Sequence, residues 1–500
     1  MALYGWQQVK RMSEKHENAR RFEADNIPKI AMNMRPAYHL TGSMGWINDP
    51  NGFSLYKGEL HLFYQANQYE KKAGSIHWGH VKTKDLIHWE RVPVALAPDM
   101  PYDRDGCFSG GAVETPDGKH LLMYTGFVEE KEAGIVRQTQ CIAVGDGTDY
   151  EKHADNPVLA EDGLPEGGSI ADFRDPKIWR EADRYMAAVV NRDRENRAVV
   201  LIYESPDGLV WKYKGTAAES DRPNGRMWEC PDFFAMDGED CFLYSVQGMD
   251  GDVPEEDRAF ETILRTGVFD RDSCRFRTDE AFLVDQGTDF YAPQTVELPD
   301  GRRIMTAWMQ SWRTANDAPD ELDFRGQMIF PRELSLADGV LVQHPARELK
   351  AYRRNYTAIK GHDGAGRFSH EDMNGRCAEL DLVIRRRGTA KPGRFMIHIA
   401  EDFSHRTVIE ADLAEGMITV DLTDSGNPES MSVRKSFPAE MENGAVRLKI
   451  LLDRYSMELF AGDGKAAASF VLYAPQEADG ISFEQTGGVS ADIDFYRLEI

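Results

Sequence analysis

Three carboxylates stand in segments that are more elaborate than plain turns. Asp49 lies in the run WINDPNG, Asp175 in DFRDPK and Glu229 in WECPD. If these groups converge in one cleft, burial and mutual repulsion force their pKa values apart, so that one stays ionised while another keeps its proton near neutral pH. Such a pair suits hydrolysis of a glycosidic bond, because one carboxylate attacks the anomeric carbon while the other protonates the leaving oxygen.

Two further segments precede a recurring strand, described below, at the same position as the three acidic runs do. Residues 107–111 supply Phe108 and Ser109, and residues 289–294 supply Tyr291, which are suited to packing against a polyol and hydrogen bonding it. Taken singly, Asn-Asp-Pro and Arg-Asp-Pro are ordinary turn sequences. Taken together, with tryptophans beside two of them, the five segments favour a binding site.

A turn followed by a strand recurs with a period of about sixty residues. Gly58, Gly118, Gly238 and Gly301 each begin such a run, and residues 183–190 supply a fifth copy without the glycine. Short strands at this period, four to a unit, are typical of β-propeller blades, although hairpins of another large all-β protein can give the spacing by accident. In a propeller, equivalent positions of the blades meet at one mouth of the channel, and the five segments share such a position.

Beyond about residue 330 the chain changes to strands that alternate apolar and polar residues, as half-buried antiparallel strands do. This pattern predicts a β-sandwich. The sequence therefore predicts an all-β fold, a five-bladed β-propeller followed by a C-terminal β-sandwich. Its expected parts are an N-terminal extension over residues 1–34 with a helix near 2–24, the propeller over 35–340, a linker with a short helical turn over 341–358, and the sandwich over 359–500.

Composition excludes several classes of protein. Lys and Arg number 59 against 84 Asp and Glu, and the net charge of −25 argues against nucleic acid or a membrane surface as partner. The six cysteines show neither CxxC pairs nor zinc-type spacing, which predicts reduced thiols and no metal site. No run of 18 apolar residues occurs and the first 26 residues contain no apolar stretch, so we expect a cytoplasmic protein.

The three acidic runs stand in the order and spacing of the motifs of one known family. Agreement extends to FYQ at 63–65, WGH at 78–80, FSG at 108–110, DFYAPQ at 289–294 and PREL at 331–334. From about His39 onward the chain resembles glycoside hydrolase family 32 enzymes of the β-fructofuranosidase type. The resemblance implies a five-bladed propeller and a sandwich, which is also what the repeats predict.

The resemblance implies a retaining double displacement without metal or organic cofactor. Asp49 would be the nucleophile that forms a fructosyl-enzyme, Glu229 the general acid and then base, and Asp175 the group that holds sugar hydroxyls and stabilises the oxocarbenium-like transition state. Arg174 can pair with Glu229 or Asp175 and orient them. The positions expected to bind substrate are Asn48, Gln65, Trp78, Phe108, Ser109, Arg174, Tyr291 and Trp308.

Two departures from the family pattern lie on the substrate side. Ala73 stands where the family commonly has a tryptophan, so the pocket is wider there or another residue completes it. Residues 308–312 (WMQSW) replace a more usual version that contains glycine. We therefore expect a small carbohydrate substrate and leave open the choice among sucrose, sucrose 6-phosphate and short fructans, as well as the oligomeric state.

Three alternatives to a fructoside hydrolase stay open at this point. A fructosyltransferase shares every catalytic residue and differs only in the acceptor of the second step. A related propeller hydrolase acting on arabinofuranosides would use three carboxylates in an inverting arrangement, against which the runs WINDPNG and WECPD argue. A carbohydrate-binding propeller without catalysis is disfavoured because all three carboxylates are present.

Overall fold

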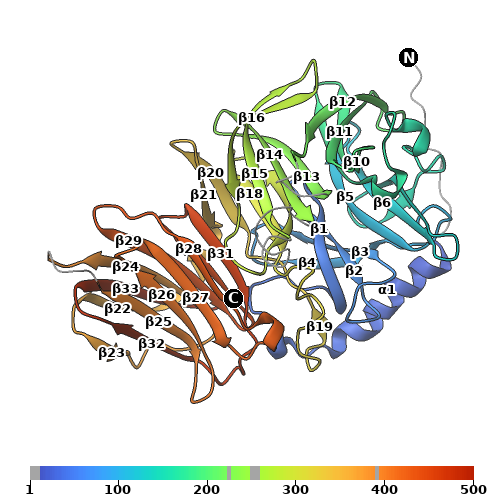
Figure 1. Cartoon of the computed structure of the whole chain (residues 1–500). Helices are drawn as coiled ribbons and strands as arrows, with labels where there is room; N and C mark the ends of the chain where they lie inside the picture. Colours follow the sequence, from blue (N-terminus) through green and yellow to red (C-terminus); the bar gives the residue numbers. More distant parts are fainter. Residues whose placement is uncertain (1–11, 222–226, 248–259, 389–392) are drawn as a thin grey trace.

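The computed structural model describes residues 12–221, 227–247, 260–388 and 393–500, and most of these residues lie in strands (Figure 1). This confirms the predicted all-β class. Within the described residues the chain has one α-helix, α1 (Glu14–Asn26), and short 3-10 helices. The 3-10 helices are η1 (Ile27–Lys29), η2 (Met32–Met34), η3 (Glu161–Gly163), η4 (Ile170–Asp172), η5 (Arg347–Tyr352) and η6 (Glu429–Met431).

Five sheets follow one another in the first two thirds of the described chain, and in each the strands are hydrogen-bonded in sequence order. The first consists of β1 (Gly45–Tyr56), β2 (Glu59–Asn67), β3 (His77–Thr83) and β4 (Glu90–Leu96), with the short β19 (Phe324–Arg325) parallel to β1. The second consists of β5 (Gly106–Glu114), β6 (His120–Glu130), β7 (Ile135–Gly145) and β8 (Tyr150–Lys152), and the third of β9 (Arg174–Glu181), β10 (Arg184–Arg192), β11 (Ala198–Ser205) and β12 (Lys212–Glu219). The fourth consists of β13 (Met227–Met236), β14 (Glu239–Gln247), β15 (Thr262–Asp270) and β16 (Arg275–Leu283). The fifth consists of β17 (Tyr291–Glu297), β18 (Arg303–Trp308), β20 (Arg332–Ala337) and β21 (Val340–Pro345).

The repeats of the sequence correspond to equivalent strands of these sheets. Each copy of the turn-and-strand pattern forms the second strand, namely β2, β6, β10, β14 or β18, and the copy without glycine is β10. Turns that begin with an aspartate join the third and fourth strands of the first and third sheets, where Asp85 and Asp207 accept hydrogen bonds from backbone N–H groups two residues later. Local turn chemistry thus sets the period of the fold.

The first strands of the five sheets contact one another in a cycle. β1 contacts β5, β5 contacts β9, β9 contacts β13, β13 contacts β17, and β17 contacts β1. The close approach of β5 to β9 needs Gly111, since a Cβ there would lie 2.9 Å from the backbone nitrogen of Ile178. This arrangement is consistent with a propeller whose first strands line the axis.

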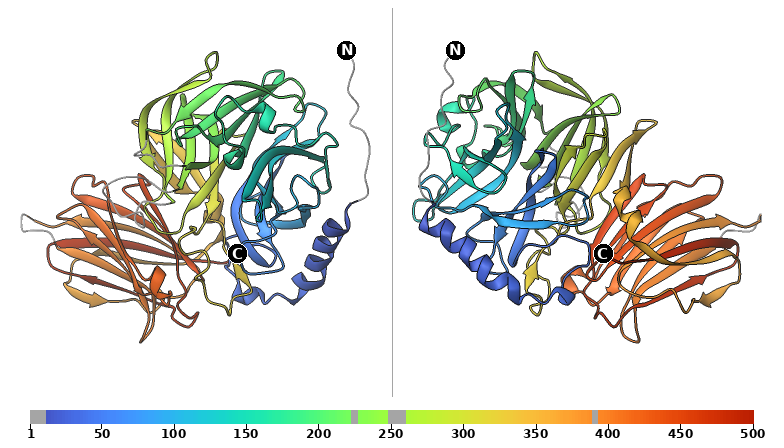
Figure 2. Two further views of the ribbon diagram at one scale, coloured as in Figure 1. Left: turned by 45° about the vertical axis from the view of Figure 1, so that its right-hand side comes forward. Right: turned by 180° about the vertical axis from the view of Figure 1, so that it is seen from behind.

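Two sheets of six strands form the C-terminal part, beside the propeller-like part in all views (Figures 1 and 2). One contains β22 (Arg353–His362), β33 (Val489–Leu498), β24 (Ala378–Arg386), β29 (Ala445–Asp453), β30 (Ser456–Ala461) and β31 (Ala466–Val471). The other contains β23 (Gly366–Phe368), β32 (Gly480–Gln485), β25 (Arg394–Glu401), β26 (Arg406–Asp412), β27 (Met417–Asp424) and β28 (Arg434–Pro438). Leu380 and Ile450 of one sheet share an apolar core with Ile397 and Val420 of the other, which is the packing of a β-sandwich.

Several elements lie at the predicted domain limits. β21 pairs with β20 and β22 pairs with β33, so the stretch predicted as linker (341–358) is shared between the two parts, and η5 connects them. The helix predicted near residues 2–24 appears as α1, capped by the Ser13 side chain, while residues 1–11 lie outside the described residues. In the part of the chain that the structure describes, no helix combines the length and the apolar character that a membrane crossing needs.

A buried ionic network joins the two parts. Arg332 donates to Glu458 Oε2 at 2.7 and 2.9 Å and to Asp285 Oδ2 at 2.9 Å, and all three side chains are buried. His39 bridges Glu458 and Asp453 through its two ring nitrogens, at 3.0 and 2.9 Å. Burial alone would lower the pKa of His39, but the bonds and charges of Asp453 and Glu458 outweigh it and raise that pKa to about 9. His39 is therefore cationic at neutral pH, and the network holds opposite charges together.

We expect Arg332→Leu to destabilise the protein by about 3–5 kcal/mol, because it leaves Glu458 and Asp285 buried without their cation. Denaturant unfolding followed by tryptophan fluorescence measures this change. The control is Arg406→Leu, which removes a half-exposed arginine 3.4 Å from Asp424 and should alter the midpoint little. Equal midpoints for the two variants would contradict the importance assigned to the network.

Candidate active site

The five segments that the sequence singles out lie on the first strands of the five sheets. Within these segments each first strand pairs irregularly with the second strand of its sheet. The irregular stretches are residues 47–50, 108–110, 174–177, 229–232 and 291–294. A bulge takes residues out of the ladder and redirects their side chains. The residues taken out of the ladder include Asp49, Ser109, Asp175, Cys230 and Ala292.

Three of these bulge residues have left-handed backbone. Asp175, Cys230 and Ala292 each precede a proline and have φ of 58°, 51° and 53°. Such a conformation costs a non-glycine residue about 1–3 kcal/mol and persists only where the surroundings fix it. Each of the three donates its backbone N–H to a neighbouring first or second strand: to Thr125 Oγ1, Asp175 Oδ2 and Ser245 Oγ at 2.9–3.1 Å. The strain is thus held by bonds between sheets.

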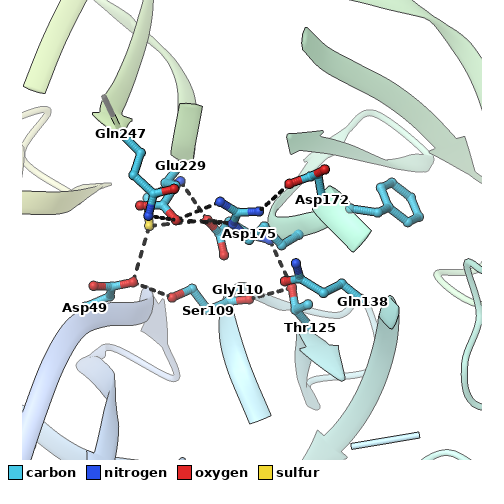
Figure 3. Close-up of polar contacts among 12 residues, drawn as sticks. Asp49, Ser109, Gly110, Thr125, Gln138, Asp172, Asp175, Glu229 and Gln247 are labelled. Carbon is cyan, nitrogen blue, oxygen red and sulfur yellow. Dashed lines mark hydrogen bonds and ion pairs between the residues drawn. The ribbon is translucent and has the colours of Figure 1, made fainter. Parts of the chain in front are cut away.

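Asp49 is buried and accepts hydrogen bonds at both oxygens, of which Figure 3 shows the one from Ser109. Ser109 donates to Oδ2 at 2.7 Å, and Asn48 donates to Oδ1 at 3.1 Å. The partners of Asn48 and Ser109 are also fixed, since Asn48 donates to Gln65 at 3.0 Å and Gln65 donates to Ser109. Three of the predicted binding residues, Asn48, Gln65 and Ser109, therefore form one network that orients the Asp49 carboxylate.

Asp175 lies on the other side of the Cys230 thiol from Asp49. The Cys230 sulfur is 3.7 Å from Asp49 Oδ2 and 3.8 Å from Asp175 Oδ2, and the Cys230 N–H donates to Asp175 at 3.1 Å. Burial, followed by the charges of the three carboxylates, raises the pKa of Cys230 well above its ordinary value. The thiol is therefore a neutral spacer between two carboxylates.

Glu229 has a different set of partners, all of them donors. Arg174 binds its Oε1 through two nitrogens at 2.9 and 3.2 Å, and Gln247 donates to the same oxygen at 3.3 Å (Figure 3). The Tyr291 hydroxyl donates to Oε2. Arg174 also lies 3.9 Å from Asp175, so it contacts two of the three carboxylates and binds Glu229 the more closely.

Burial and like charge perturb this cluster. Burial and then the charge of Glu229 raise the pKa of Asp49 to about 6, although Ser109 and Asn48 act in the opposite direction. Burial also raises the pKa of Asp175, against the effect of Arg174. Carboxyl groups that change protonation near neutral pH in one buried cluster are suited to acid–base and nucleophilic chemistry.

An aromatic cluster borders the carboxylates. Trp46 packs on Trp308 and Trp312, with ring centroids 5.8 and 5.9 Å apart, and Tyr291 belongs to the same cluster. Phe108 packs against this cluster and stacks on Phe127 at 4.3 Å. Three predicted binding residues, Phe108, Tyr291 and Trp308, are thus brought together with the carboxylates.

Trp78 has a more remote position than the other predicted binding residues. Its indole is fully buried in a different cluster, against Phe63 and Tyr124, and donates to the Phe108 carbonyl at 3.1 Å. In the described structure it therefore reaches the site through Phe108, as a support for that residue.

Ala73, the departure from the family pattern, lies exposed in the loop between β2 and β3. The aromatic side chain that covers Trp46 comes from elsewhere: Trp312, in the loop after β18, stacks on it with an interplanar angle of 27°. The sequence analysis did not select Trp312, although its spacing of four residues from Trp308 could have indicated it.

Two other contributors to the site were not predicted. Cys230 lies within the run WECPD, but its type alone did not suggest a place between two carboxylates. Gln247 ends β14 and has no motif around it, so only the pairing of β13 with β14 brings it to Glu229. Conversely, Lys177 and Asp232 belong to the acidic runs but pair with each other at 3.0 Å and link the first strands.

Among the described residues, no group of three or more His, Cys, Asp or Glu side chains is arranged to hold a metal ion. The expectation that no metal or cofactor is needed stays a prediction.

An all-β chain with three carboxylates gathered beside tryptophans, two of them buried and Glu229 half-buried, is suited to the chemistry of glycoside hydrolases. Two family models match: the glycosyl hydrolases family 32 N-terminal domain over residues 39–345 and the glycosyl hydrolases family 32 C terminal over residues 348–500. The chain belongs to glycoside hydrolase family 32, which confirms the resemblance seen in its sequence. The division between the two matches falls between β21 and β22.

Named relatives cover nearly the whole chain. A sucrose-6-phosphate hydrolase of Zymomonas mobilis is 34% identical over 457 residues, covering 87% of this chain and 86% of that protein. A raffinose invertase of Escherichia coli is 33% identical over 467 residues, covering 91% of this chain and 92% of that protein. A solved structure of a variant β-fructofuranosidase of Bombyx mori in complex with sucrose matches with a TM-score of 0.80 at 30% identity, covering 97% of this chain and 98% of that one.

Proposed function

We propose that this protein is a retaining β-fructofuranosidase that releases terminal fructosyl units from sucrose, sucrose 6-phosphate or short fructo-oligosaccharides. The observation that carries the proposal is the division of partners within the trio: Asp49 is bound by neutral donors, whereas Glu229 is bound by Arg174 and a phenol. Two equivalent carboxylates would not divide the work of nucleophile and acid. The relatives named for sucrose 6-phosphate, raffinose and sucrose support the substrate class.

In the first step an Asp49 oxygen forms a bond to the anomeric carbon of the fructosyl unit while the bond from that carbon to the leaving oxygen breaks. Ser109 and Asn48 aim the carboxylate, and neither carries a charge, so the nucleophile keeps its negative charge undiminished by a cation. The result is a covalent fructosyl-enzyme.

Glu229 gives its proton to the leaving oxygen in this step and takes a proton from water in the next. The Tyr291 hydroxyl can donate to the ionised form of Glu229 and accept from the protonated form, so it can stay bonded through both steps. Water then breaks the bond to Asp49, and fructose leaves with retained configuration. Asp175 would hold sugar hydroxyls and stabilise the positive charge of the transition state.

The finer description of the fold belongs to the same proposal. Five sheets in succession and the cycle of contacts among β1, β5, β9, β13 and β17 support five propeller blades around the site. The domain limits, the cytoplasmic location and the absence of nucleic-acid or membrane partners stay predictions.

Asp49→Asn should lower fructose release from sucrose, sucrose 6-phosphate, 1-kestose and inulin at least about 10³-fold, because the amide cannot form the covalent intermediate. Liberated fructose and the melting temperature are measured together. Asp117→Asn, in an exposed turn of the same part of the chain, is the matched control and should keep wild-type rates. Retained hydrolysis by Asp49→Asn would remove Asp49 from the role of nucleophile.

Glu229→Gln should slow the first step on sucrose by about 10²–10⁴-fold, but that on an aryl fructoside with an acidic phenol much less, since only sucrose needs a protonated leaving group. Rapid-mix measurement of the initial phenol burst isolates this step from the later attack of water. Equal losses on both substrates would argue against the acid role.

Ser109→Ala should move the acid limb of the pH dependence of kcat/KM upward by about one pH unit. The nucleophile must be ionised, so activity rises with pH through the Asp49 pKa of about 6, and removal of a bond that favours the carboxylate raises that pKa further. Initial rates on sucrose between pH 4 and 8 give the limb. A shift to lower pH, or none with kcat unchanged, would show that Asp49 does not set it.

A further inference from the structure

Asp289 is the first residue of the run DFYAPQ, which supplies Tyr291 to the active site, but the proposed catalytic steps do not use it. Asp289 is 1% exposed. Thr288 donates to its Oδ2 at 2.7 Å, and the backbone N–H of Val471, on the sandwich strand β31, donates to the same oxygen at 3.1 Å. The described donors to this buried carboxyl are therefore uncharged.

The backbone around Asp289 is bound to the same strand. The N–H groups of Thr288 and Asp289 both donate to the Ser469 carbonyl at 3.2 Å. Gly287 makes this approach possible, because a Cβ there would lie 2.1 Å from the Ser469 carbonyl oxygen. The segment that leads into β17 is thus bound to the sandwich both by its backbone and by the Asp289 carboxyl.

A third element meets Asp289 at the loop after β18. The hydroxyl of Thr314 lies near enough to favour the ionised form of the Asp289 carboxyl. Thr314 is two residues after Trp312, and the next residue, Ala315, is buried in the same aromatic cluster as Tyr291. One buried carboxyl therefore joins the segment of Tyr291, the loop of Trp312 and the strand β31.

The carboxyl is costly to keep in this place. Burial raises the pKa of Asp289 to about 7 against the effect of the hydroxyls and the N–H group that face it, and the charge of Asp285 adds to the rise. Asp285 is itself paired with Arg332 at 2.9 Å. A carboxyl with uncharged donors, two residues before the partner of the proposed acid, indicates a role in the site and not in stability alone.

We propose that Asp289 is a positioning residue for protonation of the leaving oxygen, because its carboxyl fixes where the Tyr291 hydroxyl meets Glu229. This inference rests on the proposed fructosidase function and adds a residue to it. Asp289 acts through Tyr291, whose hydroxyl donates to Glu229 Oε2. A small rotation of the Tyr291 ring misaligns that hydrogen bond, and hydrogen bonds weaken steeply with misalignment. The sandwich thereby contributes to the acid step through Val471.

Asp289→Ala should slow the first step on sucrose about tenfold and leave the phenol burst from an aryl fructoside within about twofold of the wild type, since only sucrose needs a protonated leaving group. Asp289→Asn keeps an acceptor oxygen for Val471 and Thr288 and should retain most of the wild-type rate on sucrose. Asp300→Ala, which removes an exposed aspartate from the turn between β17 and β18, is the matched control and should leave both rates unchanged.

A double-mutant cycle with Tyr291→Phe separates positioning from a structural role. Tyr291→Phe removes the hydroxyl that Asp289 places, so in that background Asp289→Ala should slow the first step on sucrose by less than about twofold further. Losses that multiply would show that Asp289 does not act through Tyr291, and the inference would be wrong. Equal losses of Asp289→Ala on sucrose and the aryl fructoside, or no loss on either, would contradict it as well.

Circular dichroism shows whether Asp289→Ala folds. If it does not, Thr288→Val and Thr314→Val each remove one hydroxyl from the carboxyl and should lower the ratio of the sucrose rate to the aryl fructoside rate about threefold. Unchanged ratios in a chain that hydrolyses both substrates would overturn this inference alone. A wild type that releases fructose from neither substrate would instead overturn the proposed function, and this inference with it.

Discussion

Repulsion among three carboxylates, the buried Asp49 and Asp175 and the half-buried Glu229, is the constraint on which the rest of the structure depends. Asp49 and Asp175 each lie within 4 Å of one thiol, and Glu229 shares Arg174 with Asp175. One arginine cannot neutralise three carboxylates, so the remaining cost has to be met by a scaffold that does not relax. Bulges on first strands, and left-handed residues whose N–H groups bond across sheets, supply that rigidity and explain why the strain sits at these positions.

The sequence predicted what local patterns determine. Glycine and acidic turns specify hairpins over a few residues, so the second strands, including β10 without its glycine, could be located, and the acidic runs identified Asp49, Asp175 and Glu229. Contacts between distant strands have no local signal. Gln247 reaches Glu229 only through the pairing of β14 with β13, and the support of Phe108 by Trp78 depends on how two sheets pack. The end of the fifth sheet at Pro345 also depends on pairing, since β21 differs little in pattern from a sandwich strand.

The sandwich supports the site as well as covering one side of the other part. Residues 285–289, just before Tyr291, bind the edge strand β31: Gln286 donates its N–H to Ala467 at 2.7 Å, and Val471 donates to Asp289 at 3.1 Å. The network around Arg332 fixes Asp285 from the opposite side. Because Tyr291 directly follows this segment and is bonded to Glu229, the position of the proposed acid depends on the joint between the two parts.

In the proposed function, fructose recognition and leaving-group recognition fall to different elements. The groups around Asp49 come from the bulged first strands and from β2. Strain and packing hold these strands in one geometry, so the side chains that bind Asp49 can vary little. In that proposal the leaving sugar faces loops instead. Ala73 is exposed, and Trp312 is the aromatic side chain that covers Trp46. The loop of Trp312 is bound to the loop of Ala73, because Lys71 donates to the carbonyl of Leu322 at 3.2 Å. Replacing a wall residue in such loops changes which substituent fits without disturbing the carboxylates, which is how one catalytic geometry can accept different leaving sugars.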